Sequence, residues 1–264
     1  MTVKTPANLR ELERATQLDP NRDLFDDRAA EVAEFFGISQ AEAVAMYKSY
    51  NVEKTATAPR FDGGSYMSIL QSYTHEDVLK RDITRLMLHY TRLEKAYDLL
   101  RILGPKYAKA TAPQLVDYGC GAADFGLAFA ACGFSVTLVD LEDGNLKFAR
   151  WRFERRGIPV KTIEINSTRE YPEFSGADVV VAGDVMEHLR DPRKAVQAVY
   201  DGLNQGGYFW FPDFPMKPKK VGGSHLVEAA ELREETAKLM LSLFGRHKDI
   251  QYLVRRRNEI QEIQ

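Results

Sequence analysis

The sequence contains little cysteine and no long apolar run. Its 264 residues include two cysteines, Cys120 and Cys132, which cannot form a disulfide framework. No uncharged apolar stretch approaches the roughly 20 residues that a membrane-spanning helix needs. The first residues also lack the hydrophobic segment of a secretory signal. We therefore expect a cytoplasmic protein with reduced thiols and no membrane partner.

An excess of basic residues is also missing. The 36 Lys and Arg residues face 38 Asp and Glu residues, which gives a formal net charge of −2. Proteins dedicated to nucleic acids usually carry a strong positive field, so we expect no nucleic-acid partner. With 44% apolar and 28% charged residues, the composition is that of an ordinary globular protein.

The first part of the chain, residues 1–112, is predicted to be helical. Helical spacing runs from Asp23 to Phe36, and Ser39 with Glu42 forms a capping box that opens the next helix, to about Tyr50. The longest predicted helix runs from about Glu76 to Leu103 and is ended by Gly104-Pro105. It carries an apolar seam, which either packs within the monomer or forms a homodimer contact through these helices.

From residue 113 onward, short β-rich segments alternate with helical ones. This order predicts an α/β fold with a mostly parallel, Rossmann-like sheet and helices on both faces. The first strand-to-helix junction carries Asp117, Gly119 and Gly121, and Asp140 ends the next predicted strand. Glycines allow a tight turn close to a ligand, and an acid at that distance commonly receives ribose hydroxyls. The pattern fits a nicotinamide dinucleotide or another adenosine ligand.

Two acids distinguish between these ligands. Asp117 would repel the pyrophosphate of a dinucleotide, and Asp124 stands where the dinucleotide fingerprint has its third glycine. An adenosine ligand with an ammonium and a sulfonium group, such as S-adenosylmethionine, would be attracted instead. An NAD-dependent oxidoreductase therefore stays as an alternative that both acids disfavour.

In order and spacing, residues 113–215 resemble the class I S-adenosylmethionine-dependent methyltransferases. The resemblance rests on VDYGCGAAD, TLVD and ADVVVAGDVMEHLRDP. It implies a seven-stranded sheet, with the cofactor across the carboxyl ends of its first strands and a lid formed by the region before the glycine loop. The cofactor-binding residues that it implies are Asp117, Gly119, Cys120, Gly121, Asp140, Leu141, Asn166, Ser167, Asp184, Tyr66, Tyr73 and Arg92. Of these, Asp140 would bind the ribose and Arg92 the methionine carboxylate.

The segment after the fourth predicted strand is similar to that of the ubiquinone-pathway O-methyltransferases. It places Asp184, Glu187 and His188 close together in sequence, and His225 follows the fifth strand. The similarity implies that Glu187, His188 and His225 are catalytic. These three and Asp184 would also suit a divalent metal ion. Without a metal, His188 or His225 would remove the acceptor proton.

The end of the chain departs from this family. After His225 it offers one helix, residues 226–244, and one clear strand, residues 249–255, where the family has two closing strands. The last edge strand is therefore expected to be missing or donated by another chain. We predict a helical lid or interface region, 1–112, and a methyltransferase core, 113–264. The expected function is methyl transfer from S-adenosylmethionine to oxygen or nitrogen of a small molecule. The alternatives are an inactive, cofactor-binding structural subunit and the oxidoreductase.

Overall fold

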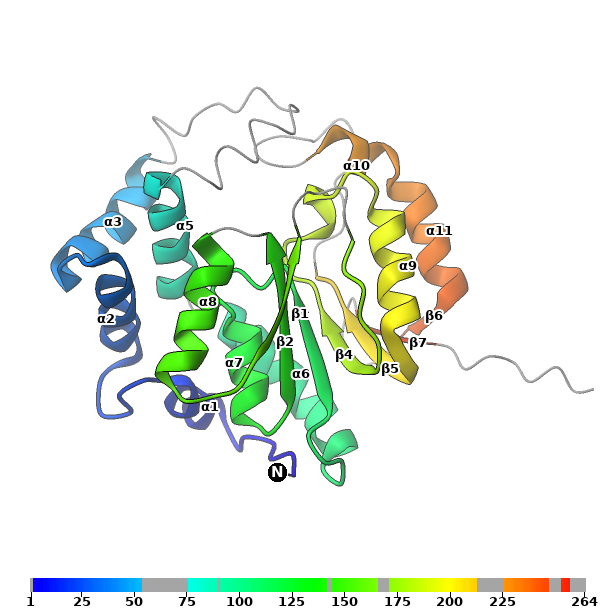
Figure 1. Cartoon of the computed structure of the whole chain (residues 1–264), viewed down its shortest axis with the longest axis horizontal. Coiled ribbons are helices and arrows are strands. Elements are labelled where there is room, and N and C mark those ends of the chain that lie inside the picture. The colour runs from blue at the N-terminus through cyan, green and yellow to red at the C-terminus, as the bar shows by residue number, and fades with distance from the viewer. Residues whose placement is uncertain are drawn as a thin grey trace, which may run out of the picture.

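The architecture comes from a computed structural model of the chain (Figure 1). Within the part of the chain that it describes, no helix combines the length and the apolar character that a bilayer crossing requires. The described residues are 2–53, 76–89, 91–141, 144–165, 171–212, 226–246 and 253–256.

Helices precede the sheet, and their ends follow the predicted capping residues. Asp23 caps the second helix by accepting a hydrogen bond from the amide of Phe25, and Gly37 ends it in the left-handed conformation at φ +64°. The capping box is confirmed, because Ser39 Oγ accepts from the amide of Glu42 while the Glu42 carboxylate accepts from the amide and hydroxyl of Ser39. These helices are α1 (Leu9–Thr16), α2 (Leu24–Phe36), α3 (Gln40–Glu53), α5 (Glu76–Leu88) and α6 (Thr91–Tyr107).

The prediction of one long helix from Glu76 to Leu103 is wrong, because α5 ends at Leu88 and α6 begins at Thr91. At this break, Arg28 Nη1 donates to the carbonyl oxygen of Met87 at 2.8 Å. In an uninterrupted helix this carbonyl would accept from the amide four residues later. Of the apolar seam, Ile83, Leu93 and Leu100 are buried inside the monomer. The predicted homodimer stays a prediction.

The predicted stop at Gly104-Pro105 is also wrong, because α6 continues through both residues to Tyr107. A proline within a helix removes a single donor, and here the last turn of α6 tolerates that loss. Gly104 is needed for packing, since a Cβ at this position would overlap Thr5 Oγ1 of the N-terminal segment.

Across the described ranges, the sheet has seven strands in the order β3-β2-β1-β4-β5-β7-β6. The first five run parallel, which confirms the predicted α/β fold, and β7 pairs antiparallel with both β5 and β6. The expected loss of the last edge strand is therefore corrected: the short strand β6, which follows directly on a helix, was missed. The strands are β1 (Gln114–Tyr118), β2 (Ser135–Leu141), β3 (Lys161–Ile165), β4 (Ala177–Val181), β5 (Leu203–Trp210), β6 (Phe244–Arg246) and β7 (Leu253–Arg256).

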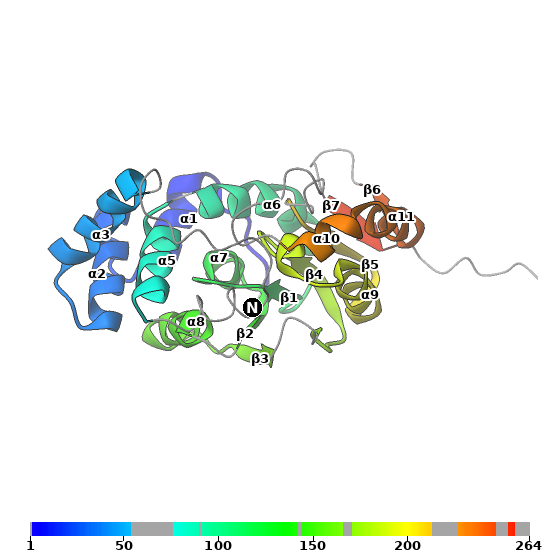
Figure 2. The same ribbon diagram turned by 90° about the horizontal axis from the view of Figure 1, so that it is seen from above.

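Helices cover both faces of the sheet (Figure 2). Alternate strand residues such as Leu115 and Leu138 pack with α1, α6, α7 and α8, whereas Val116 and Val139 pack in the cluster that contains α9 and α11. The predicted helix over residues 226–244 is interrupted at Leu232. The remaining helices are α7 (Asp124–Ala131), α8 (Gly144–Arg155), the 3-10 turn η1 (Met186–His188), α9 (Pro192–Gly202), α10 (Val227–Glu231) and α11 (Arg233–Leu243).

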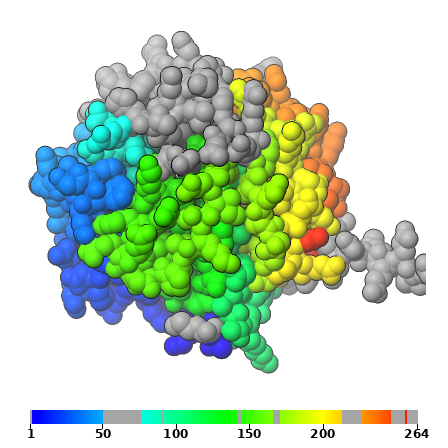
Figure 3. Space-filling view, viewed as in Figure 1, coloured from blue at the N-terminus to red at the C-terminus, as the bar shows by residue number. Residues whose placement is uncertain are grey.

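The N-terminal helices share their core with the sheet. Leu12 of α1 and Leu93 of α6 lie in one cluster with Phe129 of α7, and Ala29 of α2 lies in another with Ala122 of the glycine loop. Figure 3 shows the N-terminal helices, the green central part and the C-terminal helices following one another across one face. The proposed domain boundary at residue 112 falls between α6 and β1, and two separate domains stay a prediction.

The described part of the β3–β4 connection, residues 171–176, is not helical. Phe174 of this segment packs on the carboxyl end of α9. A Cβ at Gly202 would overlap the ring of Phe174 and lie 2.8 Å from its carbonyl oxygen. Glycine at this position therefore allows the connection to lie directly against the helix.

Gly202→Ala should lower the free energy of unfolding by about 2 kcal/mol, because overpacking outweighs the better helix propensity of alanine. Urea unfolding measures the change. Gly37→Ala is the control: nothing lies within 4 Å of its Cβ, so left-handed strain alone should cost about 1 kcal/mol. Increased stability of Gly202→Ala would contradict the packing described.

Candidate functional site

The loop between β1 and α7 lies at the carboxyl edge of the sheet (Figure 1). Gly119, Gly121 and Ala123 all adopt positive φ, at 68°, 52° and 58°. A Cβ at Gly119 would overlap Val185 Cγ2, and one at Gly121 would lie 3.2 Å from both Arg92 Nη1 and Leu86 Cδ1. The glycines are thus required by backbone conformation and by close packing, as the sequence predicted.

Asp140 lies beside this loop, at the end of β2. Its Oδ2 accepts from the amide of Gly121 at 2.8 Å, and its Oδ1 accepts from the amide of Leu141 at 2.8 Å. Burial raises the pKa of Asp140 above its usual value, although both amide donors act against this shift. The predicted ribose-binding acid therefore touches the glycine loop directly.

Asp117 lies on the α7 side of the loop and is 2% exposed. Its Oδ2 accepts from the amide of Gly126 in α7 at 2.9 Å. Burial raises the pKa of Asp117 to about 7, and the Gly126 hydrogen bond opposes the rise. Near neutral pH this carboxyl is therefore only partly charged, so it repels a pyrophosphate less than the sequence suggested. Its contact with a cofactor stays a prediction.

Asp124, the first residue of α7, is held by two buried guanidinium groups. Arg152 Nη1 donates to Asp124 Oδ1 at 2.9 Å, and Arg28 Nη2 donates to the same oxygen at 3.2 Å. Burial acts to raise the pKa of Asp124, but Arg28 and Arg152 hold it below its usual value. This acid is a structural residue of the loop. The sequence analysis missed both arginines: Arg28 stands between Asp27 and Ala29 on α2, and this local pattern gives no sign of burial.

Arg92 and Asp184 form an ion pair across the carboxyl edge. Arg92 Nη2 lies 2.9 Å from Asp184 Oδ2, while the Arg92 side chain is 15% exposed and that of Asp184 is 51% exposed. Asp184 also has a φ of +58°, which is strained for a residue other than glycine. The structure thus brings together two residues that the sequence placed at the cofactor site independently.

Glu187 and His188 lie in η1, directly after this strained residue. Glu187 is buried, and its Oε1 lies 3.9 Å from His188 Nε2. The carbonyl oxygen of Glu187 accepts from the amide of Leu226 at 2.9 Å. The residue that follows His225 in sequence is therefore tied to η1.

The metal site stays a prediction. In the described ranges, no group of three or more His, Cys, Asp or Glu side chains could hold an ion. The pairing of Asp184 with Arg92 places a guanidinium beside one of the predicted ligands, which disfavours a cation there. Several predicted site residues lie outside the described residues, namely His225, Tyr66, Tyr73, Asn166 and Ser167.

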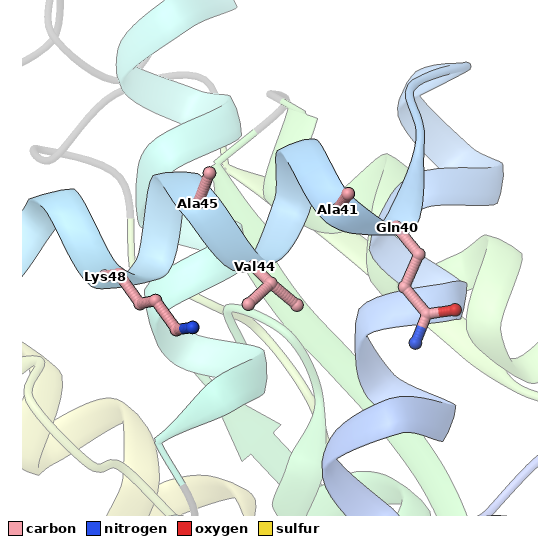
Figure 4. A pocket seen from close by; sticks show the side chains of 5 residues that line it. All are labelled: Gln40, Ala41, Val44, Ala45 and Lys48. Carbon is pink, nitrogen blue, oxygen red and sulfur yellow. The ribbon is translucent and has the colours of Figure 1, made fainter.

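Two surface hollows lie away from the glycine loop. One, of about 550 Å³, is lined by a single face of α3 (Figure 4). The other, of about 450 Å³, lies against the first residues of β1, β3 and β4, at the opposite end of the strands from the loop. Neither contains a residue predicted for the cofactor site. In α/β sheets of this kind, ligands bind at the carboxyl ends of the strands.

The central part of the chain is similar to known methyltransferases. Residues 116–209 match the family model described as a methyltransferase domain. Ubiquinone biosynthesis O-methyltransferase of Bordetella avium is 29% identical over 113 residues, which are 40% of this chain and 44% of that protein. The enzyme of the same name from Nitrosomonas europaea is 33% identical over 109 residues, 40% of this chain and 45% of that protein. The chain thus spans less than half the length of these relatives.

One solved structure is similar to the chain at low identity. The N-methyltransferase NodS of Bradyrhizobium japonicum, in complex with S-adenosyl-L-homocysteine, is 18% identical, with 74% of this chain and 98% of that chain covered and a TM-score of 0.48. This likeness is too distant to carry an argument about function. The family match itself confirms the predicted resemblance to class I methyltransferases for residues 116–209.

Asp117→Asn should change how stability depends on pH. Because the folded-state pKa of Asp117 is about 7 and the usual value is 3.8, folding takes up a proton between these values, and stability falls as pH rises through this window. Asparagine removes the titration and still accepts from Gly126. The variant should match the wild type near pH 4 and exceed it by roughly 2–4 kcal/mol at pH 8.

Urea unfolding at pH 4, 6 and 8 measures the stability of Asp117→Asn. In the same measurement, Asp124→Asn should show the opposite effect. It leaves Arg28 and Arg152 without their shared carboxylate, so stability at pH 8 should fall by about 3 kcal/mol or more. The account of Asp117 would be contradicted if Asp117→Asn were also less stable than the wild type at pH 8.

Proposed function

We propose that the protein is an S-adenosylmethionine-dependent methyltransferase that acts on an oxygen or nitrogen atom of a small molecule. The observation that carries this proposal is the position of Asp140, which the amide of Gly121 holds against the glycine loop of a methyltransferase domain. A carboxylate at that position receives ribose hydroxyls.

The residues at the loop fit the cofactor. Asp140 accepts two amide hydrogen bonds and one from the Cys120 side chain, which leaves acceptor capacity on its carboxylate for ribose hydroxyls. Arg92 uses Nη2 for Asp184, while its Nη1 lies over Gly121 and can pair with the methionine carboxylate. Gly119 and Cys120 keep the loop close to β2, since both amides donate to the carbonyl oxygen of Val139.

Methyl transfer requires little covalent chemistry from the protein itself. When bound, S-adenosylmethionine supplies a methyl group on a positively charged sulfur. The residues of this chain would orient the acceptor in line with that methyl group and exclude water. His188 or His225 would take the proton that the acceptor loses, and Glu187, which lies beside His188, would orient the imidazole. No metal ion is required for these steps.

The acceptor is proposed by analogy with the relatives. Those that match in sequence are named ubiquinone biosynthesis O-methyltransferases, which supports a small molecule with a hydroxyl group. The near-neutral net charge supports an acceptor other than nucleic acid. We also propose a cytoplasmic location, supported by two buried free cysteines, and a homodimer through the N-terminal helices.

Calorimetric titration with S-adenosylhomocysteine and with NAD tests the proposal. The wild type should bind S-adenosylhomocysteine and not NAD. Asp140→Asn should weaken the binding of S-adenosylhomocysteine by about tenfold or more, because a charged acceptor for the ribose hydroxyls is lost.

Glu164→Gln is the matched control for this experiment. Glu164 lies opposite Asp140 in the register of β2 and β3, and it pairs with Arg150 at the surface. Its replacement should leave the affinity unchanged. Tight binding of NAD by the wild type, or equal losses in both variants, would contradict the proposed function.

A further inference from the structure

A buried cluster of charged side chains joins the N-terminal helices to the glycine loop. We name it the loop anchor. Arg28 and Arg152 are among the largest fully buried side chains of the described residues. The cluster consists of Arg28 and Glu31 from α2, Arg152 from α8, Arg156 from the turn that follows α8, and Asp124 from α7.

The loop anchor holds the backbone of the glycine loop as well as its acid. Arg152 Nη1 donates both to the carbonyl oxygen of Ala122 and to Asp124 Oδ1. Between these two residues lies Ala123, whose positive φ of 58° is strained for alanine and which makes no side-chain cap to α7. Arg152 therefore binds the loop on both sides of Ala123.

The loop anchor also contacts α5, on the other side of the proposed cofactor site from the glycine loop. Arg28 donates from Nη2 to Asp124 and from Nη1 to the carbonyl oxygen of Met87, near the end of α5. The α5–α6 junction that follows leads to Arg92, whose Nη1 lies over Gly121. One guanidinium group thus links the start of α7 to the end of α5, and α6, which carries Arg92, begins shortly after α5 ends.

The cluster stays charged at working pH. The guanidinium groups of Arg28 and Arg152 hold the pKa of Asp124 below its usual value, and those of Arg152 and Arg156 do the same for Glu31 against the opposing effect of burial. Glu31 in turn bonds Arg152 at 3.3 Å and Arg156 at 2.5 Å. Paired in this way, the buried charges define one arrangement of α2, α8 and the loop.

We propose that Arg28 is a positioning residue for the cofactor: through the loop anchor, α2 sets the geometry of the glycine loop and hence the affinity for the adenosine ligand. The part that concerns affinity rests on the proposed function. The part that concerns the loop does not, because it can be measured without a ligand.

Arg28→Met tests the proposal, with Asp27→Asn as the matched control. Asp27 is the neighbouring buried charge on α2, but its two oxygens accept from the amides of Leu18 and Asp19 in the α1–α2 connection, at 2.9 Å each. Both variants disturb α2, and only Arg28→Met removes contacts with the loop and with α5. If Arg28→Met does not fold, Arg28→Lys replaces it, because lysine keeps the charge and loses the two-pronged contact.

Two readouts are taken below the melting temperature of every variant. The first is hydrogen exchange of the Gly121 and Gly126 amides without ligand. These amides donate to Asp140 and Asp117, the carboxylates that hold the loop. The second is the Kd for S-adenosylhomocysteine. In Arg28→Met, exchange should quicken and Kd should rise, each by about tenfold. In Asp27→Asn, both should stay within about twofold of the wild type.

The proposal is overturned if Arg28→Met leaves both readouts at their wild-type values, or if Asp27→Asn changes them equally. Faster exchange in Arg28→Met alone, in a protein whose wild type does not bind S-adenosylhomocysteine, would support the positioning of the loop and reject the proposed function. Faster exchange with an unchanged Kd would reject the role of Arg28 in affinity.

Discussion

Three carboxylates hold the turn from β1 into α7, two through backbone amides and one through buried arginines. Asp140 accepts from the backbone amides of Gly121 and Leu141, Asp117 accepts from the amide of Gly126, and Asp124 lies between two buried arginines. A loop that passes through three left-handed residues would not keep this shape by its own preferences. The surrounding structure fixes the shape of the loop, and the proposed cofactor site depends on that shape.

The arrangement also explains why helices that precede the sheet belong to the site. Arg28 on α2 reaches the loop and the end of α5, and Arg92 at the start of α6 reaches Asp184 after β4. The helices therefore contribute a buried arginine that holds the loop, Arg28, and a charged residue at the edge of the site, Arg92. The region before β1 therefore helps to hold the loop in its conformation, in addition to any role as a lid.

Local sequence rules accounted for much of the fold. Capping residues, alternating strands and the glycine pattern predicted α2, the parallel strands and the loop, because these depend on neighbouring residues. Two of the errors have different origins. The end of α5 coincides with a contact from far along the chain, because Arg28 donates to the carbonyl oxygen of Met87. The strand β6 has only three residues, too few for an alternating pattern, and it pairs with β7. The loop anchor was missed because charged residues are usually exposed, and its five members come from three separate helices and the turn after α8.

The central claim is that this edge of the sheet holds an adenosine ligand that carries a sulfonium group. A crystal structure of the protein with S-adenosylhomocysteine tests it most directly. The account predicts the ribose hydroxyls on the two oxygens of Asp140 and the ligand carboxylate on Arg92, with the glycine loop in its present conformation. Ligand density elsewhere on the molecule, or an empty loop at saturating ligand, would contradict it.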